Sequence, residues 1–314
     1  MTYKRSILVS GFDASIRMRN RQLLICDGKE QRGSIPLDEV DILVIDTPLT
    51  MLTNAAVVEL AAEGGVIALC DSKHIPGALV LPIEGHCLHA QRLRLQMEVS
   101  TPTKKRIWQQ LIQAKVINQA DALRGLQKEK PATKLETLSK TVLSGDTTNV
   151  EAQAAQLYWR EWLSEEMPDF NRDPDGEPPN LLLNYGYAIL RAAVARAIVT
   201  VGLHPAVGLF HHNKTNAFAL ADDVMEPFRP FVDTTVHELY TKHNISTLDQ
   251  KAKATLINVL HIACQCDGHR SSILNAINHL CDSIILMMMG RTNKLSVPSK
   301  STDETIISTE EENE

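Results

Sequence analysis

Side chains that could bind a metal are densest between Leu203 and Pro230. The segment reads LHPAVGLFHHNKTNAFALADDVMEPFRP and holds three imidazoles and three acids: His204, His211, His212, Asp222, Asp223 and Glu226. Asp223 and Glu226 are three positions apart, so on a helix both carboxylates would share one face. Two like charges on an apolar face are costly unless a cation joins them. Carboxylate oxygens with one imidazole suit Mg²⁺ or, better, Mn²⁺.

A purely structural interpretation of this segment stays open. Asp222 and Asp223 could form a solvated helix start, and the histidines could be ordinary core or surface residues. Pro227 also weakens the shared-face argument, because the residue before a proline is disfavoured in a helix. A helix through Glu226 is therefore expected to kink or end there.

A further acid, Glu151, lies in the first turn of an expected helix. The pattern NVEAQAAQLY places small residues behind it, which let a helix pack closely. An acid in a first turn also complements the positive end of the helix dipole, which is the structural alternative for Glu151.

Motifs of other enzyme classes are missing from the sequence. It contains no phosphate-binding loop of the G-x-x-x-x-G-K-[ST] type, no G-x-G-x-x-G and no G-x-S-x-G. The chain therefore shows no sign of an NTPase, a dinucleotide enzyme or a serine hydrolase. Cys264-x-Cys266 has the wrong spacing for a zinc site, and we expect this segment to be a buried helix.

The charge distribution is uneven. The chain has 314 residues and a net charge of −6, and its last fourteen residues hold six acids and no base. The segment Gln91–Lys130 contains nine Lys and Arg residues against three acids. A basic segment of this size can neutralise several phosphates, although a solvated helix face is the alternative.

Two domains and a tail are expected from the change in periodicity. Residues 1–88 form a small β-rich domain, 89–295 an α-helical domain, and 296–314 an acidic, disordered tail. The PDFNRDPDGEPP stretch at 168–179 should be an exposed loop. In the β-rich domain we expect one helix, Asn54–Glu63, and five strands: Ser6–Val9, Leu23–Cys26, Asp41–Ile45, Val66–Cys70 and Ala78–Pro82.

The second domain should be built from helices with a 3.6-residue period. We expect them at Lys104–Gln127, Val150–Ser164, Asn180–Val201, Asp233–Tyr240, Leu248–Cys266 and Arg270–Met289. The sequence shows no secretion signal and no apolar run of about 20 residues that would span a membrane. Cysteines are sparse, at six, so a cytoplasmic protein with no membrane partner is expected.

Three motifs, in order and spacing, resemble the CRISPR-associated protein 1 family, the integrase of CRISPR adaptation. They are N-x-E-x-x-A-A-x-x-Y from Asn149 to Tyr158, G-L-F-H from Gly208 to His211, and D-x-x-E-x-F-R-P from Asp223 to Pro230. Asn184–Ala188 looks like the helix between the first two motifs. Ile35–Leu37, Val44–Asp46 and Leu69–His74 look like the type II branch, and the resemblance covers roughly residues 4–290.

The resemblance implies a fold, a metal site and partners. The fold class is α+β, a β-sandwich-like domain followed by a larger all-α catalytic domain. Glu151, His211 and Glu226 match the catalytic metal-binding triad for Mg²⁺ or Mn²⁺. Asp223 matches an accessory acid and Asp222 a surface acid. Members form homodimers that flank a dimer of CRISPR-associated protein 2, and the type II branch accompanies the effector nuclease.

The implied activity is that of a metal-dependent DNA endonuclease and integrase. The 3′-hydroxyl of a short prespacer DNA would attack a phosphodiester at the end of a CRISPR repeat. Candidates for DNA phosphate contacts are Arg92, Arg94, Lys104, Lys105, Arg106, Lys214 and Arg229. Arg229 could instead pair with Glu226. Two alternatives are a non-catalytic DNA-binding subunit of the same assembly and a metal-dependent hydrolase of a small substrate.

Overall fold

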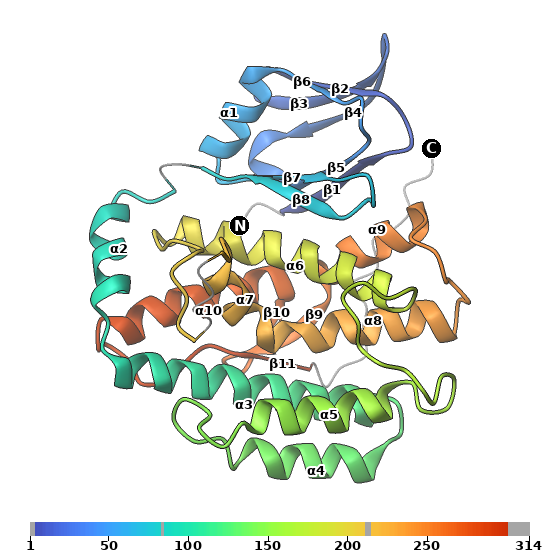
Figure 1. The fold of residues 1–314 in the computed structure, drawn as a ribbon. Coiled ribbons are helices and arrows are strands. Elements are labelled where there is room, and N and C mark those ends of the chain that lie inside the picture. Colours follow the sequence, from blue (N-terminus) through green and yellow to red (C-terminus); the bar gives the residue numbers. More distant parts are fainter. Residues whose placement is uncertain (1–3, 83–84, 211–214, 301–314) are drawn as a thin grey trace.

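The computed structural model describes residues 4–82, 85–210 and 215–300 (Figure 1). A β-rich N-terminal domain sits on a larger helical domain, and the chain passes from one to the other near residue 85. The expected α+β fold class is confirmed. The predictions for His211, His212, Lys214 and the end of the acidic tail concern residues outside the described ranges.

Two four-stranded sheets pack face to face in the N-terminal domain. The lower sheet contains, in order, β1 (Arg5–Ser10), β5 (Val40–Asp46), β7 (Val66–Cys70) and β8 (Pro76–Val80). The upper sheet contains β4 (Glu30–Pro36), β3 (Gln22–Asp27), β2 (Ala14–Arg19) and β6 (Met51–Leu52). β1, β5 and β7 are parallel, and β8 is antiparallel to β7. The short η1 (Leu37–Glu39) precedes β5, and α1 (Asn54–Ala62) covers one end.

The central strand β5 is buried at every position, which explains its unbroken apolar run. Leu43 and Ile45 face the core between the two sheets, whereas Ile42 and Val44 face the core of the helical domain. Its two end acids are paired across the domain boundary. Asp41 lies 2.7 Å from Arg196, and Asp46 lies 2.6 Å from Lys253. These pairs fix the sandwich on the helices.

The helical domain is organised around two long helices, α3 (Thr101–Gly125) and α6 (Asn180–Thr200). α6 passes under the lower sheet, and α3 runs below α6 (Figure 1). The remaining helical elements are α2 (His89–Glu98), α4 (Glu129–Ser139), α5 (Val150–Trp162), α7 (Ala219–Met225), η2 (Glu226–Phe228), α8 (Arg229–Thr241), α9 (Gln250–Asn258), η3 (Val259–His261) and α10 (Ile273–Met288). The PDFNRDPDGEPP stretch is a loop, as predicted.

By length and composition alone, α6 could cross a membrane. Its apolar window is 83% buried inside the protein, because α6 packs against the sheet, α8, α9 and α10. We therefore interpret α6 as the core helix of the fold.

The expectation of a purely helical second domain needs a correction. β9 (Ala263–Cys266), β10 (His269–Ser272) and β11 (Pro298–Lys300) form a small antiparallel sheet. The helix predicted for Leu248–Cys266 is therefore wrong beyond Asn258. Cys264 and Cys266 are both buried while Ala263 and Gln265 are less so, which is the two-residue period of a strand. β11 also lies inside the stretch predicted as a tail from residue 296.

Several elements escaped prediction for a common reason. β2, β4, α2 and α4 carry many charged or polar residues because each has an exposed face. β2, for example, has the sequence ASIRMR, in which the first three residues are buried and the last three are mostly exposed. α2 buries only Gln96, so its sequence lacks the apolar stripe on which helix prediction depends.

Candidate active site

Glu151 is held in the first turn of α5 by an aspartate that the sequence analysis missed. The two carboxylate oxygens of Asp146 accept hydrogen bonds from the backbone N–H groups of Val150 at 2.8 Å and Glu151 at 3.0 Å. The helix N-terminus thus receives a side-chain cap from just outside it. Asn149 between them takes a left-handed conformation, with φ of 52°. A polar SGDTTN stretch before the helix was the available signal.

Glu226 lies at the tight turn between α7 and α8. η2 interrupts the helix there, as Pro227 predicts. The side chain of Asn118 on α3 donates to the Pro227 carbonyl at 2.8 Å and so holds the turn against α3. Glu226 is only 4% exposed. A buried carboxylate of this kind requires a cationic partner.

The side chain of Lys115 joins the two glutamates. Its ammonium nitrogen lies 2.7 Å from Glu151 Oε1 and 2.5 Å from Glu226 Oε2. Lys115 comes from the middle of α3, so three helical elements converge on one cation. Burial lowers the pKa of Lys115, but Glu226 and Glu151 raise it more, so the pKa is higher than usual. The ammonium is therefore charged at neutral pH.

Asp223 has a different role from Glu226 in the structure. It is fully buried, and its Oδ2 accepts hydrogen bonds from the backbone N–H groups of Leu209 at 2.6 Å and Phe210 at 3.0 Å. The carboxylate thereby fixes the turn that leads into His211. Its function as a metal ligand remains a prediction.

Asp222 is not the surface acid that we expected. It is 9% exposed, and its two oxygens contact Arg191 at 2.7 Å and Asn216 at 2.8 Å. α7 turns its acidic positions inward because the whole helix is buried. The other imidazole of the segment, His204, is exposed, and its Nδ1 accepts the N–H of Ala206 at 3.2 Å.

A cavity of about 260 Å³ adjoins the carboxylate pair. Its lining comes from four α-helices, η2 and one loop, and it combines cations, aromatic rings, acids and an amide: Lys115, Gln119, Ala155, Trp159, Arg172, Tyr187, Glu226, Arg229 and Asp233. The guanidinium carbons of Arg229 and Arg172 lie 4.6 Å and 5.5 Å from the centre of the Tyr187 ring. Such an arrangement favours an anion that carries a flat or apolar group.

The guanidinium groups of both cavity arginines are held by contacts within the protein. Arg229 Nε lies 2.9 Å from Glu226 Oε1, which confirms the alternative that it pairs with this acid. Arg172 donates to Asn184 at 2.5 Å and Asn180 at 3.0 Å, and thus anchors the 168–179 loop to α6. Sequence analysis missed Arg172 because a loop residue gives no periodic signal.

The residues present fit a divalent cation. Two carboxylates from separate helices already converge on the single positive charge of Lys115, and their hard oxygens suit Mg²⁺ or Mn²⁺. Among the residues that the structure describes, no three His, Cys, Asp or Glu side chains form a complete metal cluster. The third predicted ligand, His211, lies outside them.

Comparison with known proteins identifies the family. The model of the family "CRISPR associated protein Cas1" matches residues 7–261. The chain belongs to the Cas1 family. It is 36% identical over 284 residues to the CRISPR-associated endonuclease Cas1 of Neisseria meningitidis, which covers 90% of this chain and 91% of the relative. A second such endonuclease, from Pyrobaculum aerophilum, is 32% identical over 74% of this chain and 82% of its own length.

Solved structures confirm the Cas1 fold. A casposase bound to its integration product superposes with a TM-score of 0.78 at 22% identity, covering 94% of this chain and 93% of the casposase. A chain of a Cas6-RT-Cas1–Cas2 complex gives a TM-score of 0.74 at 17% identity, covering 96% of this chain and 37% of that one. The match to the family model includes Glu151, Glu226 and the position of His211.

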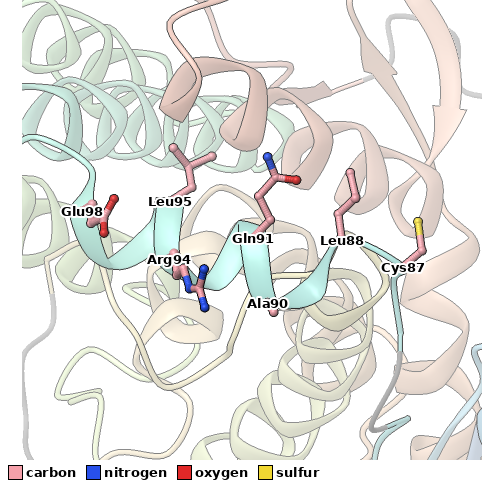
Figure 2. A pocket seen from close by; sticks show the side chains of 7 residues that line it. All are labelled: Cys87, Leu88, Ala90, Gln91, Arg94, Leu95 and Glu98. Atoms are coloured by element: carbon pink, nitrogen blue, oxygen red, sulfur yellow. The ribbon is translucent and has the colours of Figure 1, made fainter.

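The predicted DNA-contact residues of this Cas1 protein differ in availability. Arg92 on α2 donates to the Val201 carbonyl at 2.7 Å, so it ties α2 to the end of α6. Arg94 is exposed and lines an open pocket on α2 with Leu95 and Glu98 (Figure 2). Lys105 and Arg106 are exposed and Lys104 partly so, one turn into α3.

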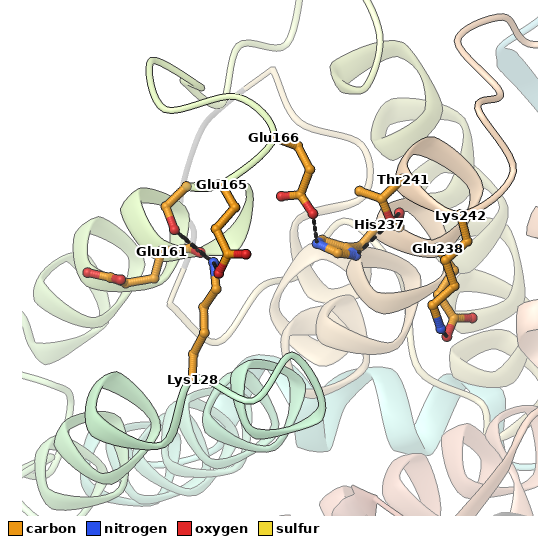
Figure 3. Close-up of polar contacts among 9 residues, drawn as sticks. Lys128, Glu161, Glu165, Glu166, His237, Glu238, Thr241 and Lys242 are labelled. Carbon is orange, nitrogen blue, oxygen red and sulfur yellow. Dashed lines mark hydrogen bonds and ion pairs between the residues drawn. The ribbon is translucent and has the colours of Figure 1, made fainter.

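Other cations of the basic segment Gln91–Lys130 are neutralised within the protein. Figure 3 shows the Lys128 ammonium at the end of α5, where it lies 2.5 Å from the Glu161 carbonyl and 3.8 Å from Glu165. Arg124 contacts Asp121, Glu129 and Glu136. Within this segment, the cations available to a polyanion therefore lie at the start of α3, on α2 and at the exposed Lys130 of α4.

Proposed function

We propose that this Cas1 protein is a divalent-metal-dependent DNA integrase and endonuclease of CRISPR adaptation. It joins the 3′-hydroxyl of a short prespacer DNA to a phosphodiester at the end of a CRISPR repeat. The observation that carries the proposal is the convergence of Glu151 and Glu226 on one cation in a Cas1 fold. Water in place of the 3′-hydroxyl gives endonuclease activity from the same site.

The reaction exchanges one phosphodiester for another, so it needs no nucleoside triphosphate. When bound, Mg²⁺ or Mn²⁺ would supply a Lewis acid for the phosphate and would lower the pKa of the attacking hydroxyl. Glu151, Glu226 and His211 are the residues that would hold it. Asp223 acts on the site indirectly, because it fixes the turn before His211.

The cationic side chains beside the carboxylates position the DNA. Arg172 and Arg229 face the cavity, where two fixed guanidiniums provide directed donors for phosphate oxygens. Lys104, Lys105, Arg106 and Arg94 supply further contacts to the DNA backbone, which orient it without reading its sequence.

The proposed partners follow from the comparisons and the resemblance. A casposase with this fold was solved with its integration product, which supports DNA as the substrate. A complex named for Cas1 and Cas2 contains a chain of this fold, which supports Cas2 as a partner. The homodimer and the dimeric state of Cas2 are what the family resemblance implies. The type II effector nuclease is a further proposed partner, and the proposed compartment is the cytoplasm of a prokaryote.

Replacement of the predicted ligands tests the proposal. Glu226→Ala and His211→Ala should abolish insertion of a labelled duplex into a repeat-bearing plasmid with Mn²⁺ and Cas2, while the dimer persists. Glu165→Ala removes an acid whose side chain is 80% exposed, and it should insert DNA like the wild type. Wild-type insertion by either ligand variant would remove that residue from the site.

Two other functions are separable by experiment. A hydrolase of a small substrate would bind no DNA in the absence of metal, whereas the basic start of α3 should retain a labelled duplex. A non-catalytic subunit would bind the duplex but leave a branched DNA uncut in Mn²⁺. Metal-dependent cleavage of branched DNA supports the integrase.

A further inference from the structure

We propose that Lys115 is a displaceable placeholder for the divalent cation, and that its ammonium moves to a DNA phosphate in the adjoining cavity once the metal binds. The second half of this statement rests on the proposed function, because it takes DNA as the ligand. The first half concerns only the metal and the two glutamates.

One position cannot hold both cations. The Lys115 ammonium already contacts one oxygen of each glutamate, at 2.7 Å and 2.5 Å. Mg²⁺ binds oxygens at about 2.1 Å, so each carboxylate needs to move by only about half an ångström to ligate it. A divalent ion at these oxygens would repel an ammonium at the same place strongly in a buried site. Metal binding therefore requires Lys115 to leave.

The placeholder explains how the site persists without metal. Glu226 is 4% exposed, and an unpaired carboxylate at that depth would destabilise the fold. Lys115 removes this penalty because its ammonium, tethered to α3, pairs with both carboxylates at 2.7 Å and 2.5 Å. The consequence is a lower apparent metal affinity, since the ion has to break two short ion pairs.

The cavity offers the displaced ammonium a place to go. Lys115 is itself part of the cavity lining, as is Gln119, which lies one helical turn further along α3. Gln119 is 3% exposed, and its Oε1 has no hydrogen-bond partner among the described residues. This oxygen can accept one hydrogen bond from the ammonium.

An anion is needed to hold the displaced Lys115 ammonium in the cavity. Arg172 and Arg229 also line the cavity, and three cations close together repel one another unless a negative group joins them. A phosphate of bound DNA supplies that charge and accepts several charge-assisted hydrogen bonds. Metal binding and phosphate binding should therefore assist each other through Lys115.

Metal affinity measures the placeholder directly. Mn²⁺ binding is followed by electron paramagnetic resonance for the wild type, Lys115→Met and a control, Lys134→Met, which changes an exposed lysine on α4. We expect Lys115→Met to bind Mn²⁺ at least tenfold more tightly, to melt lower without metal, and to gain more stability from Mn²⁺. Equal Mn²⁺ affinity in Lys115→Met and wild type would overturn the proposal.

A measurement on the wild-type protein covers the case in which Lys115→Met does not fold. Limited acetylation with acetic anhydride, read by peptide mass spectrometry, reports how accessible each lysine is. Saturating Mn²⁺ should raise labelling of Lys115 several-fold and leave Lys134 unchanged. Labelling of Lys115 that stays constant across the Mn²⁺ titration would contradict displacement.

Binding of DNA tests the second half. The probe is a duplex with single-stranded, 3′-dideoxy ends, so no strand transfer occurs. In the wild type Mn²⁺ should raise the affinity for this probe, and in Lys115→Met the gain should shrink several-fold. An equal gain in both proteins overturns the phosphate contact. If Lys115 is displaced by Mn²⁺ but the wild type inserts no DNA, the proposed function fails while the placeholder stands.

Discussion

The rings of Trp108 and Phe210 stack with their centroids 4.3 Å apart and their planes 4° from parallel. Trp108 is buried in α3, two helical turns before Lys115, whereas Phe210 is 44% exposed and immediately precedes His211. Residues seven apart share a helix face, so the stack and the Lys115 ammonium lie on the same side of α3. This contact therefore places Phe210, the last described residue before the third predicted ligand, on the face of α3 that carries Lys115.

Loss of the stack should impair catalysis more than folding. Phe210→Ala removes a stacking contact worth about 1 kcal/mol, and with it the ring contact that holds residue 210 on α3 just before the predicted ligand. We expect half-site insertion to fall about tenfold, which corresponds to about 1.4 kcal/mol in the barrier. Because Phe210 is half-exposed, the melting temperature should change little. Phe210→Tyr keeps the ring and should retain activity; equal losses in both variants would refute a positioning role.

Asp223 should behave as a structural acceptor. Asp223→Ala leaves the buried N–H of Leu209 and the N–H of Phe210 without this acceptor, which should lower the free energy of unfolding by about 1–3 kcal/mol. Insertion should fall as well, whereas Mn²⁺ affinity should fall less than in Glu226→Ala. Calorimetry measures the loss of stability, and Mn²⁺ titration measures the loss of metal affinity. A loss of Mn²⁺ affinity as large as that of Glu226→Ala would make Asp223 a ligand instead.

The acids of the site could be found from the sequence because short motifs surround them. Glu151 follows a helix-start signal, and Glu226 is followed by Pro227, Arg229 and Pro230. Lys115 gave no such signal: it was one of nine bases in the segment Gln91–Lys130, and only the fold brings it between two distant glutamates. Asp222 was predicted to be a surface acid because an acid pair at a helix start is usually solvated, and the local sequence does not show that α7 is buried.

The same distinction applies to the fold. β5 was predictable because both of its faces are buried, so every position is apolar or an end acid. β9 was taken as helix because the apolar residues from Leu256 to Cys266 fit either period over a short run. Long-range pairs such as Asp41–Arg196 leave no local pattern at all.

The start of α3 should carry the salt-sensitive part of DNA binding. Replacement of Lys104, Lys105 and Arg106 by Gln removes up to three phosphate contacts, which should weaken binding and reduce the slope of log affinity against log salt by about 2–3. Fluorescence anisotropy across a salt titration measures it. Lys128→Met serves as the control, because its ammonium is engaged with Glu161 and Ser164. If the slope of log affinity against log salt is unchanged in the triple variant, these three side chains form a solvated helix face that does not contact DNA.

The two domains should unfold together through the Asp41–Arg196 pair. Arg196 Nη2 lies 2.7 Å from Asp41, and its Nε donates to the Gly64 carbonyl at 2.7 Å. Arg196→Met leaves the buried Asp41 carboxylate with one ion pair among the described residues, to Lys4 at 3.6 Å. The free energy of unfolding should therefore fall by about 3 kcal/mol or more. Denaturant unfolding measures this loss. Arg160→Met, which changes a mostly exposed arginine on α5, should unfold like the wild type.

Asp233 should make stability depend on pH near neutrality. Burial raises the pKa of its carboxyl to about 7, although the hydroxyls of Tyr187 and Tyr158 and the charges of Arg229 and Arg172 oppose this. In the unfolded chain the same group loses its proton near pH 4. Between these values the folded protein binds more protons, so this stabilising contribution is complete below pH 4 and is lost as the pH rises through 7.

Replacement of the carboxyl by a neutral amide should remove this dependence. From pH 5 to pH 8, the stability of Asp233→Asn relative to wild type should rise by about 2 kcal/mol. Over this range the wild type loses stability, because its carboxyl ionises readily in the unfolded chain but only at a cost when it is buried in the folded protein. Melting temperatures of both proteins at half-unit steps of pH give the difference. Asp249→Asn, a helix cap on α9, is the control and should show no trend centred on pH 7. Parallel curves for Asp233→Asn and wild type would show that the carboxyl ionises near its ordinary pKa.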